Sequence, residues 1–414
     1  MNYSRACFLV SFILTLASPR CIGAPIAQAG QTQLHGPDRP GVHAGAPATK
    51  PAGALPAALS APAPHITGIF VPQPASNTTL ARGASYSVTE LHFPPGASNL
   101  KVAAINNRRS IVGNYIGRGK VPTGFLYSNG KLTVYPGEEL IGINDLDMFA
   151  GATIDPVKGN HAIFGSATGA NPLSQADFIA SEATAMNNAG TVVGLVYIRK
   201  YFKLPAIWQN GVLNVLSPIP GTIETNIRAV NADGLILGNV RLAGNKPSAT
   251  VVWTKREIKA LSGLTDGVAI NDTGVVVGAW RGPAGLASKS VKTVTVGKEK
   301  ISNALIWKFG NIIDLGTLPG FGPSIPCAID NKGVVVGAVS TPDNKHTVGF
   351  IYADGKIADL NGASGARPAF NLDKAEGIDN NGDIAAHAVV KGVEELLLLT
   401  PSVASPVAAP AGGE

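Results

Sequence analysis

The stretch Ala-Ile-Asn-Asn-Arg-Arg-Ser-Ile-Val-Gly at residues 104–113 recurs in variant form, giving seven copies along the chain. Successive copies begin 38 to 59 residues apart. A period of this length, built from short strand-like segments, is typical of quasi-symmetric arrays rather than of folds organised around one site. The other six copies span residues 142–151, 185–194, 229–238, 269–278, 328–337 and 377–386.

The residue types within the repeat predict a tight turn between two strands. Position two is Ile, Val or Met, and position three is Asn or Asp in every copy. Position six is Gly in five copies, whereas Arg109 and Asp147 occupy it in the first two. Asx side chains bond to the backbone two residues on, and Gly adopts a positive φ without steric cost. We therefore predict hairpin turns, altered or strained at Arg109 and Asp147, while the Gly at position ten predicts a bulge or a close backbone approach.

A second motif follows each copy and completes a four-stranded unit. It is an apolar strand that often ends in an aromatic residue, such as residues 205–208, followed by a turn such as Asn210-Gly211 and by a fourth strand. Four short strands joined by tight turns are typical of a propeller blade. The second unit has no clear fourth strand, and residues 177–179 are its best candidate.

The ends of the array indicate how it closes. The last unit stops after its third strand, at residues 400–401, and an unpaired strand at residues 86–91 precedes the first unit. We predict an all-β fold, a seven-bladed β-propeller of four-stranded blades over residues 85–401, in which the N-terminal strand completes the last blade. Such closure hides a sheet edge. Six or eight blades remain alternatives.

The remaining segments have compositions that cannot build a core. Residues 1–23 read as a signal peptide, with Arg5 before an apolar run at residues 6–17 that is short for a membrane span. Residues 24–84 form an Ala-, Pro- and Gly-rich linker, predicted to be largely disordered, and residues 402–414 form a disordered tail. We expect a secreted, periplasmic or cell-surface protein with no membrane span after signal removal.

Cysteine and charge content narrow the possible partners. Signal removal would take Cys7 and Cys21, so Cys327 is expected to stand alone. The net charge is +6, but residues 1–84 hold five basic residues and one acidic residue, which leaves 28 basic and 26 acidic residues, a net of +2, in the remainder. Without a basic patch interleaved with aromatics, no nucleic-acid partner is predicted. We expect a monomer.

The repeat resembles that of the bacterial extracellular HAF-type repeat family. Residues 161–164, His-Ala-Ile-Phe, match its namesake triplet most closely. Residues 314–320 resemble the family's inter-unit stretch, and residues 397–401 resemble its usual terminus. The resemblance covers about residues 85–401 and implies export and a repeat β fold. It implies no catalytic residues.

The Asx residues at position three are the first candidate ligand site. In a closed ring they would circle one rim of the channel as a polar site. The alternative is that each side chain caps its own turn, which alone explains the residue type. These residues are Asn106, Asn144, Asn187, Asn231, Asn271, Asp330 and Asp379.

Aromatic residues and an insertion supply the other candidates. Trp208, Trp253 and Trp307 share one strand position, which favours packing between blades over a sugar-binding face. Trp280 falls outside this register and is the better surface candidate. The longest repeat spacing includes residues 282–300, which predicts either an extra basic hairpin for an anionic partner or a solvated loop. Its candidate binding lysines are Lys289, Lys292 and Lys298.

The chain carries no recognisable catalytic, metal or cofactor motif. Residues 144–147 and 379–383 look faintly like calcium loops but lack a nearby bidentate Glu, so no metal and no cofactor are predicted. We expect an exported, non-catalytic propeller that presents a binding surface to an unidentified protein or glycan at the cell envelope. The alternatives are a glycan-acting hydrolase or lyase with carboxylates at the channel mouth, and a purely structural surface repeat.

Overall fold

The computed structural model describes residues 86–157, 159–199, 202–243, 248–283, 291–296, 299–363 and 371–402. These residues all belong to one of the two compact units into which the chain divides. They are almost entirely antiparallel β-structure, with one 3-10 turn, η1 (Arg118–Lys120), and one short helix, α1 (Leu360–Ala363). The predicted signal peptide, linker and nearly all of the tail lie outside the described residues.

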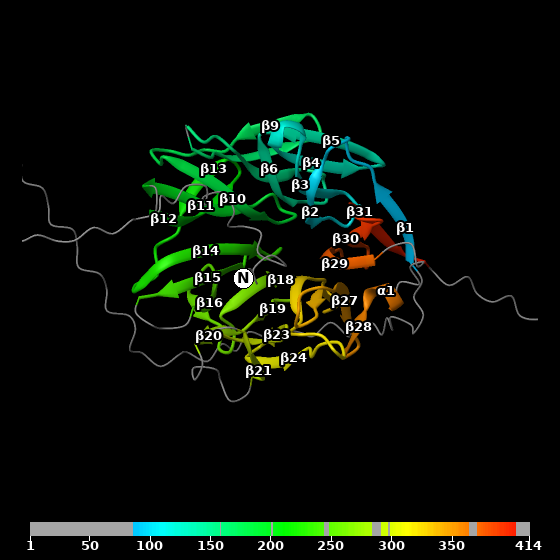
Figure 1. The fold of residues 1–414 in the computed structure, drawn as a ribbon. Coiled ribbons are helices and arrows are strands. Elements are labelled where there is room, and N and C mark those ends of the chain that lie inside the picture. The colour runs from blue at the N-terminus through cyan, green and yellow to red at the C-terminus, as the bar shows by residue number, and fades with distance from the viewer. Residues whose placement is uncertain are drawn as a thin grey trace, which may run out of the picture. The chain divides into compact units, whose positions relative to one another are not determined.

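Seven sheets of four strands follow one another around a common axis (Figure 1). Within the first six sheets the strands run outward from the axis in chain order. The first three sheets contain β2 (Ser98–Ile105), β3 (Ile111–Ile116), β4 (Pro122–Ser128) and β5 (Lys131–Pro136); β6 (Glu138–Ile143), β7 (Phe149–Thr153), β8 (Ala162–Ser166) and β9 (Gly169–Pro172); and β10 (Ala180–Met186), β11 (Val192–Arg199), β12 (Phe202–Gln209) and β13 (Val212–Val215).

The next three sheets have the same strand order, with one insertion. They contain β14 (Thr222–Val230), β15 (Ile236–Leu242), β16 (Ala249–Trp253) and β17 (Ile258–Ala260); β18 (Asp266–Ile270), β19 (Val276–Ala279), β23 (Leu305–Lys308) and β24 (Asn311–Asp314); and β25 (Ile325–Ile329), β26 (Val335–Ser340), β27 (Thr347–Ala353) and β28 (Lys356–Asp359). The insertion in the fifth sheet forms a separate three-stranded sheet of β20 (Arg281–Pro283), β22 (Glu299–Ser302) and β21 (Thr293–Val296). An extra hairpin, one of the two predicted forms of the insertion, is therefore present.

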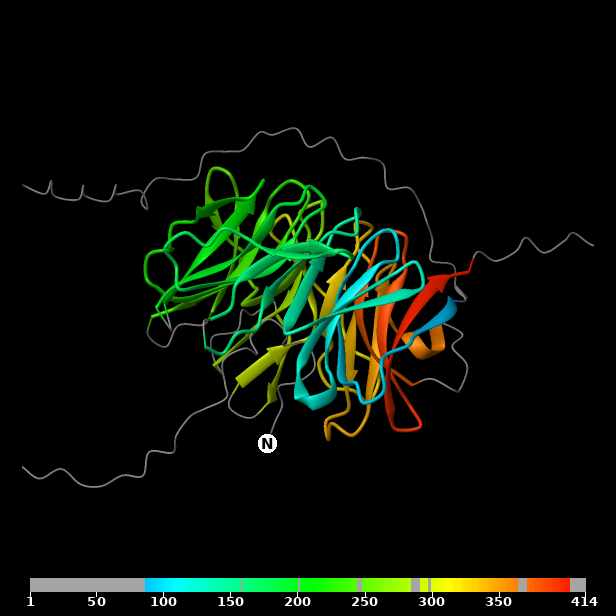
Figure 2. The same ribbon diagram turned by 90° about the horizontal axis from the view of Figure 1, so that it is seen from above.

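The seventh sheet joins both ends of the described chain. It contains β29 (Asn371–Ile378), β30 (Ile384–Val390), β31 (Val393–Pro401) and, on its outer edge, β1 (Tyr86–Leu91). Strand β1 pairs antiparallel with β31, from Tyr86 opposite Pro401 to Leu91 opposite Leu396. Figure 2 shows the two strands side by side at the edge of the array. The N-terminal strand thus occupies the position that the truncated last repeat leaves open.

The repeated turn has the conformation that its residue types predict. In the first copy, Asn106 Oδ1 accepts hydrogen bonds from the backbone N–H of Arg108 at 3.0 Å and of Ser110 at 2.9 Å. Position six has a positive φ in all seven copies, as at Gly190 (76°). Arg109 and Asp147 also adopt it, with φ of 66° and 58°, so these two turns keep the geometry in a region that side chains disfavour.

The glycine at position ten is required by a bulge in the neighbouring strand. A Cβ on Gly113 would lie 2.1 Å from the carbonyl oxygen of Lys101, and one on Gly194 would lie 2.0 Å from that of Glu182. In both sheets the register between the first two strands shifts beside this position. The bulge brings backbone against backbone, so no side chain fits there.

The hydrophobic core lies between neighbouring sheets. Each of seven clusters of buried side chains joins two adjacent sheets. One cluster packs Leu396 and Leu398 of the seventh sheet against Ile111 and Phe125 of the first. Trp208, Trp253 and Trp307 are buried in three others, as the core-packing interpretation predicts.

One prediction of detail is wrong. The fourth strand of the second sheet is β9, whereas residues 177–179 lie in the loop before β10. Strand β9 has only four residues, Gly-Ala-Asn-Pro, which are types more common in turns. It lacks the β-branched residues that identify strands in a sequence. Cys327 is disulfide-bonded in the structure of the full chain, whereas the prediction that it stands alone concerned the chain after signal removal. The expectation depended on removal of Cys7 and Cys21.

Candidate functional site

The Asx residues at position three are buried and bonded within the fold. They are only 2% to 7% exposed. Besides capping their own turns, several reach the next sheet: Asn106 Nδ2 donates to the backbone oxygen of Asn144 at 2.7 Å, and Asn271 Nδ2 donates to that of Asp330 at 2.9 Å. These hydrogen bonds agree with the turn-capping interpretation and leave little of the side chains to face a ligand at the rim.

The residues at position four form a second hydrogen-bonded layer, which we call the rim belt. At six of the seven junctions between sheets, the side chain at this position accepts the backbone N–H of its counterpart in the preceding sheet, at 2.8 to 3.0 Å. One of these bonds links the last sheet to the first, from Asn380 N to Asn107 Oδ1. The belt consists of Asn107, Asp145, Asn188, Ala232, Asp272, Asn331 and Asn380.

The predicted surface position of Trp280 is wrong. Trp280 is 3% exposed and packs among Leu264, Val276 and Val291, and its backbone N–H donates to Ser302 Oγ at 2.9 Å. Val291, which packs in the same cluster, belongs to the insertion, and the repeat register could not reveal this contact. Of the predicted lysines, Lys292 is exposed beside β21, whereas Lys289 and Lys298 lie outside the described residues.

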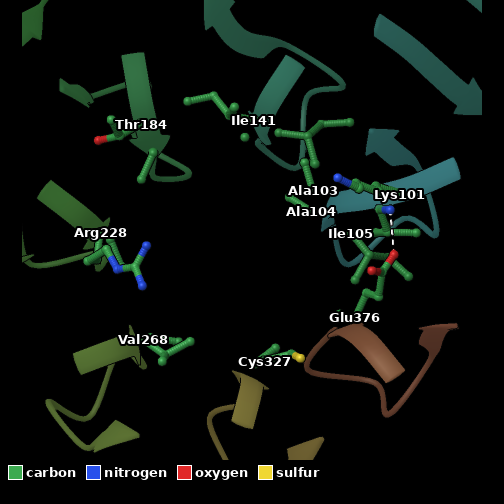
Figure 3. A pocket seen from close by; sticks show the side chains of 18 of the residues that line it. Lys101, Ala103, Ala104, Ile105, Ile141, Thr184, Arg228, Val268, Cys327 and Glu376 are labelled. Carbon is green, nitrogen blue, oxygen red and sulfur yellow. Dashed lines mark hydrogen bonds between the residues drawn. The ribbon is translucent and has the colours of Figure 1, made fainter. Parts of the chain in front are cut away.

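The inner strands of all seven sheets line one cavity of about 350 Å³ on the axis (Figure 3). The lining includes small residues such as Ala103, Ala185, Ala229 and Ala269. In every sheet the residue three positions before the repeated Asx lines this cavity. These residues are Ala103, Ile141, Thr184, Arg228, Val268, Cys327 and Glu376.

One wall of the cavity holds a compact, fully bonded ion pair. Lys374 Nζ lies 2.7 Å from Glu376 Oε1, and both side chains are largely buried. The other carboxylate oxygen, Glu376 Oε2, accepts the backbone N–H of Val102 at 2.6 Å. This contact joins the seventh sheet to the first. Because both oxygens of Glu376 are bonded within the protein, we interpret the ion pair as stabilising the ring rather than binding a ligand.

On the other side of the cavity, Arg228 shares a carboxylate with a second guanidinium that lies behind the lining. Arg228 Nη2 lies 3.4 Å from Asp266 Oδ1, and Arg281 Nε lies 3.4 Å from Asp266 Oδ2. Asn239 Nδ2 also donates to Asp266 Oδ1, at 3.3 Å. Asp266 is thus shared by Arg228, Arg281 and Asn239.

Two buried carboxyl groups lie on adjacent inner strands. Burial raises the pKa of Glu139, nearby Glu182 raises it further, and Lys101 opposes the shift. Burial also raises the pKa of Glu182, against the lowering effects of a hydrogen bond from Tyr197 and of the charge on Lys203. Glu139 lines the cavity, whereas Glu182 is engaged by Tyr197 of β11.

Sequence reasoning missed the cavity residues because it followed the turns rather than the inner strands. The available signal was a charged residue in an otherwise small and apolar strand, such as Arg228 in β14 or Glu376 in β29. Counting back three residues from the Asx of each repeat would have placed them in the channel. Among the described residues, no group of His, Cys, Asp and Glu gathers closely enough to hold a metal ion, and none of the helices is long and apolar enough to cross a bilayer.

Comparisons with known proteins support the fold. No protein-family model and no curated protein sequence matches the chain. Among solved structures, the β-propeller domain of the Trilobed protease from Pyrococcus furiosus, which has an open velcro topology, is similar with a TM-score of 0.52 and 11% identity, over 74% of this chain and 94% of that chain.

Other solved structures are similar at lower scores. An acylaminoacyl peptidase in complex with Z-Gly-Gly-Phe-chloromethyl ketone has a TM-score of 0.48 and 13% identity, over 72% of this chain and 51% of that chain. YCF48 bound to D1 peptide has a TM-score of 0.44 and 10% identity, over 79% of this chain and all of that chain (100%). At such identities the likeness concerns the fold alone. The chain has an all-β fold of the β-propeller type.

Proposed function

We propose that this chain is a non-catalytic binding protein of the cell envelope, which closes as a seven-bladed ring and holds its ligand in the axial cavity. Export is proposed from the signal-like residues 1–23, and membership of the HAF-type repeat family from residues 161–164 and 314–320. The proposal replaces the rim Asx residues and Trp280 with the cavity as the binding site, because those side chains are buried.

One observation carries the proposal: every sheet contributes to a single cavity that mixes charged and aliphatic groups. Ligand sites of proteins are concave, mostly apolar, and supplied with a few convergent polar groups. The volume of about 350 Å³ lies at the lower end of the range for such sites, about 300–1,000 Å³. Because each wall belongs to a different sheet, the rigid array presents the groups preorganised.

A cavity-filling variant tests the proposal. Ala103 is exposed to the cavity, so Ala103→Trp should occupy it without disturbing the core. Val157→Trp, at a position that is 90% exposed, is the matched control because it adds the same side chain outside the cavity.

Thermal shift would be measured with envelope glycans, short peptides, calcium and EDTA. A ligand of the folded state raises the unfolding midpoint. We expect the same shift in the wild type and Val157→Trp, and none in Ala103→Trp. An undiminished shift in Ala103→Trp, or no shift of the wild type by any glycan or peptide, would contradict the proposal.

A second candidate function is a glycan-acting hydrolase or lyase, favoured by the raised pKa values of Glu139 and Glu182. A protonated carboxyl beside an ionised one is the pairing that general acid and base chemistry uses. Turnover of envelope glycans by the wild type, lost by about 100-fold or more in both Glu139→Gln and Glu182→Gln, would support this function. Turnover unaffected by either substitution would refute it.

A further inference from the structure

Arg228 is a cavity cation with an uncommitted hydrogen-bond donor. Its side chain is 13% exposed, and its guanidinium points into the open centre in Figure 3. Two of its nitrogens make only long contacts: Nε to the backbone oxygen of Gly267 and Nη2 to Asp266 Oδ1, both 3.4 Å. Nη1 has no protein partner among the described residues. A guanidinium bonds strongest at shorter distances, about 2.7–2.9 Å, so Arg228 can engage a further anion.

The carboxylate nearest to this cation is shared with other groups. Both oxygens of Glu376 are already bonded, one to Lys374 and one to the backbone N–H of Val102, so this carboxylate does not pair with Arg228. Asp266 divides its carboxylate among Arg228, Arg281 and Asn239. A mostly buried guanidinium that shares its counter-ion is a favourable partner for a carboxylate, because the low local dielectric strengthens the pairing.

The groups beside Arg228 are aliphatic. Val268 lies in the same inward-pointing layer on the adjacent strand, with Thr184 on the other side and Ile141 beyond it. The described lining residues include no aromatic ring on which the face of a sugar could stack. A guanidinium beside aliphatic side chains can bind a carboxylate and pack against aliphatic groups. This arrangement therefore suits an acidic residue flanked by aliphatic residues better than it suits a glycan.

We propose that the cavity receives an acidic side chain of a peptide partner, whose carboxylate binds the Arg228 guanidinium while its aliphatic neighbours pack on Ile141 and Val268. This inference rests on the proposed function, since it requires the axial cavity to be the binding site. Planar pairing of guanidinium with carboxylate gives such a contact orientation as well as affinity.

Titration with matched peptides tests this assignment. The probes are a pool of acetylated, amidated hexapeptides that each carry one Glu between aliphatic residues, and the same pool with Gln in place of Glu. Calorimetry would use the full chain as wild type, Arg228→Met, Arg228→Lys and Arg241→Met. Arg241 is the control because its pair with Glu224, at 3.0 Å, lies on the same sheet but outside the cavity lining.

We expect the wild type and Arg241→Met to bind the Glu pool at least about tenfold more tightly than the Gln pool, with the preference weakening in salt. Arg228→Met should lose the preference, and Arg228→Lys should keep part of it because it retains charge without the fork. A preference that survives in Arg228→Met overturns the inference. Sodium glucuronate, an acidic sugar, is a further probe. If it binds to the wild type but not to Arg228→Met, while neither peptide pool binds, the inference is also overturned.

The Ala103→Trp variant distinguishes failure of the acidic-peptide inference from failure of the proposed function. If Ala103→Trp abolishes binding but the Glu and Gln pools bind alike, the acidic-peptide inference fails while the cavity remains the site. If the Glu pool still binds to Ala103→Trp as tightly as to the wild type, the proposed function fails.

Discussion

Asp330→Asn should stabilise the protein, because Asp330 is one of only two carboxylates in a ring of amides. Its Oδ1 accepts the backbone N–H of Lys332 at 2.9 Å and of Val334 at 2.8 Å, as the Asn residues do in their turns. Its Oδ2 is buried and has no hydrogen-bond partner among the described residues. At the equivalent place Asn271 carries a donor, whose Nδ2 bonds to the next sheet.

The size of the effect follows from these contacts. Asn keeps the Oδ1 contacts, removes the orphaned acceptor, and directs a new Nδ2 at the backbone oxygen of Asp379, by analogy with Asn271. An unsatisfied buried polar group costs about 1–3 kcal/mol, and a new hydrogen bond contributes about 0.5–1.5 kcal/mol. We expect a gain of about 1–3 kcal/mol in the free energy of unfolding at neutral pH.

The gain should depend on pH. Burial raises the pKa of Asp330, against lowering by the backbone N–H groups of Val334 and Lys332. A raised folded-state pKa contributes stability that is present below the unfolded value of 3.8 and is lost as the pH rises through the folded value. The wild type should therefore approach the variant in acid, where a protonated Asp330 can itself donate.

Urea unfolding followed by tryptophan fluorescence, at about pH 7.5 and about pH 4, measures both effects. Asn271→Asp is the converse control: it removes the 2.9 Å bond to Asp330 and should destabilise the protein by a similar amount. An Asp330→Asn variant that is no more stable than the wild type at neutral pH would refute this reasoning about the ring.

Four further predictions concern the array. Burial raises the pKa of Asp379 to about 6 from 3.8, so the wild type should lose stability as the pH rises between these values, and Asp379→Asn should flatten that slope in urea titrations. Deletion of residues 86–91 should lower the free energy of unfolding by several kcal/mol, since it uncovers the edge of β31, and an unchanged melting curve would count against closure by this strand. Gly274→Val should lose about 1–3 kcal/mol because φ is 76°, whereas Gly274→Asn should lose less; equal midpoints would show that the turn tolerates side chains. Ala232→Asn supplies the acceptor missing from the rim belt beside Asn188 and should add about 0.5–1 kcal/mol, detectable as a higher urea midpoint.

The local rules of the repeat were predictable from sequence because each depends on one or two residues. Asn106 implies its turn, Gly190 implies a positive φ, and Gly113 implies a close backbone approach; all three are present. Strand β9 was missed because residues 169–172 lack strand-forming residue types. The position of Trp280 was wrong because Val291, which packs in the same cluster, belongs to an insertion that the repeat does not encode.

The cavity could not be predicted because it depends on residues far apart in the chain. The nitrogen of Val102 bonds to Glu376, which lies in another sheet. Asp266 is shared by Arg228 and Arg281 only once β14, β18 and β20 are neighbours. The alternation of side chains along β14 would have pointed Arg228 inward, but the sharing of Asp266 with Arg281 is a property of the assembled sheets.

The location of a bound peptide tests the central claim most directly. We would determine the crystal structure of the full chain with the tightest-binding Glu hexapeptide from the pool. The account predicts the peptide in the axial cavity, with its carboxylate within hydrogen-bond distance of the Arg228 guanidinium and its aliphatic side chains against Ile141 and Val268. A peptide bound to the rim belt or to an outer strand, with the cavity empty, would contradict it.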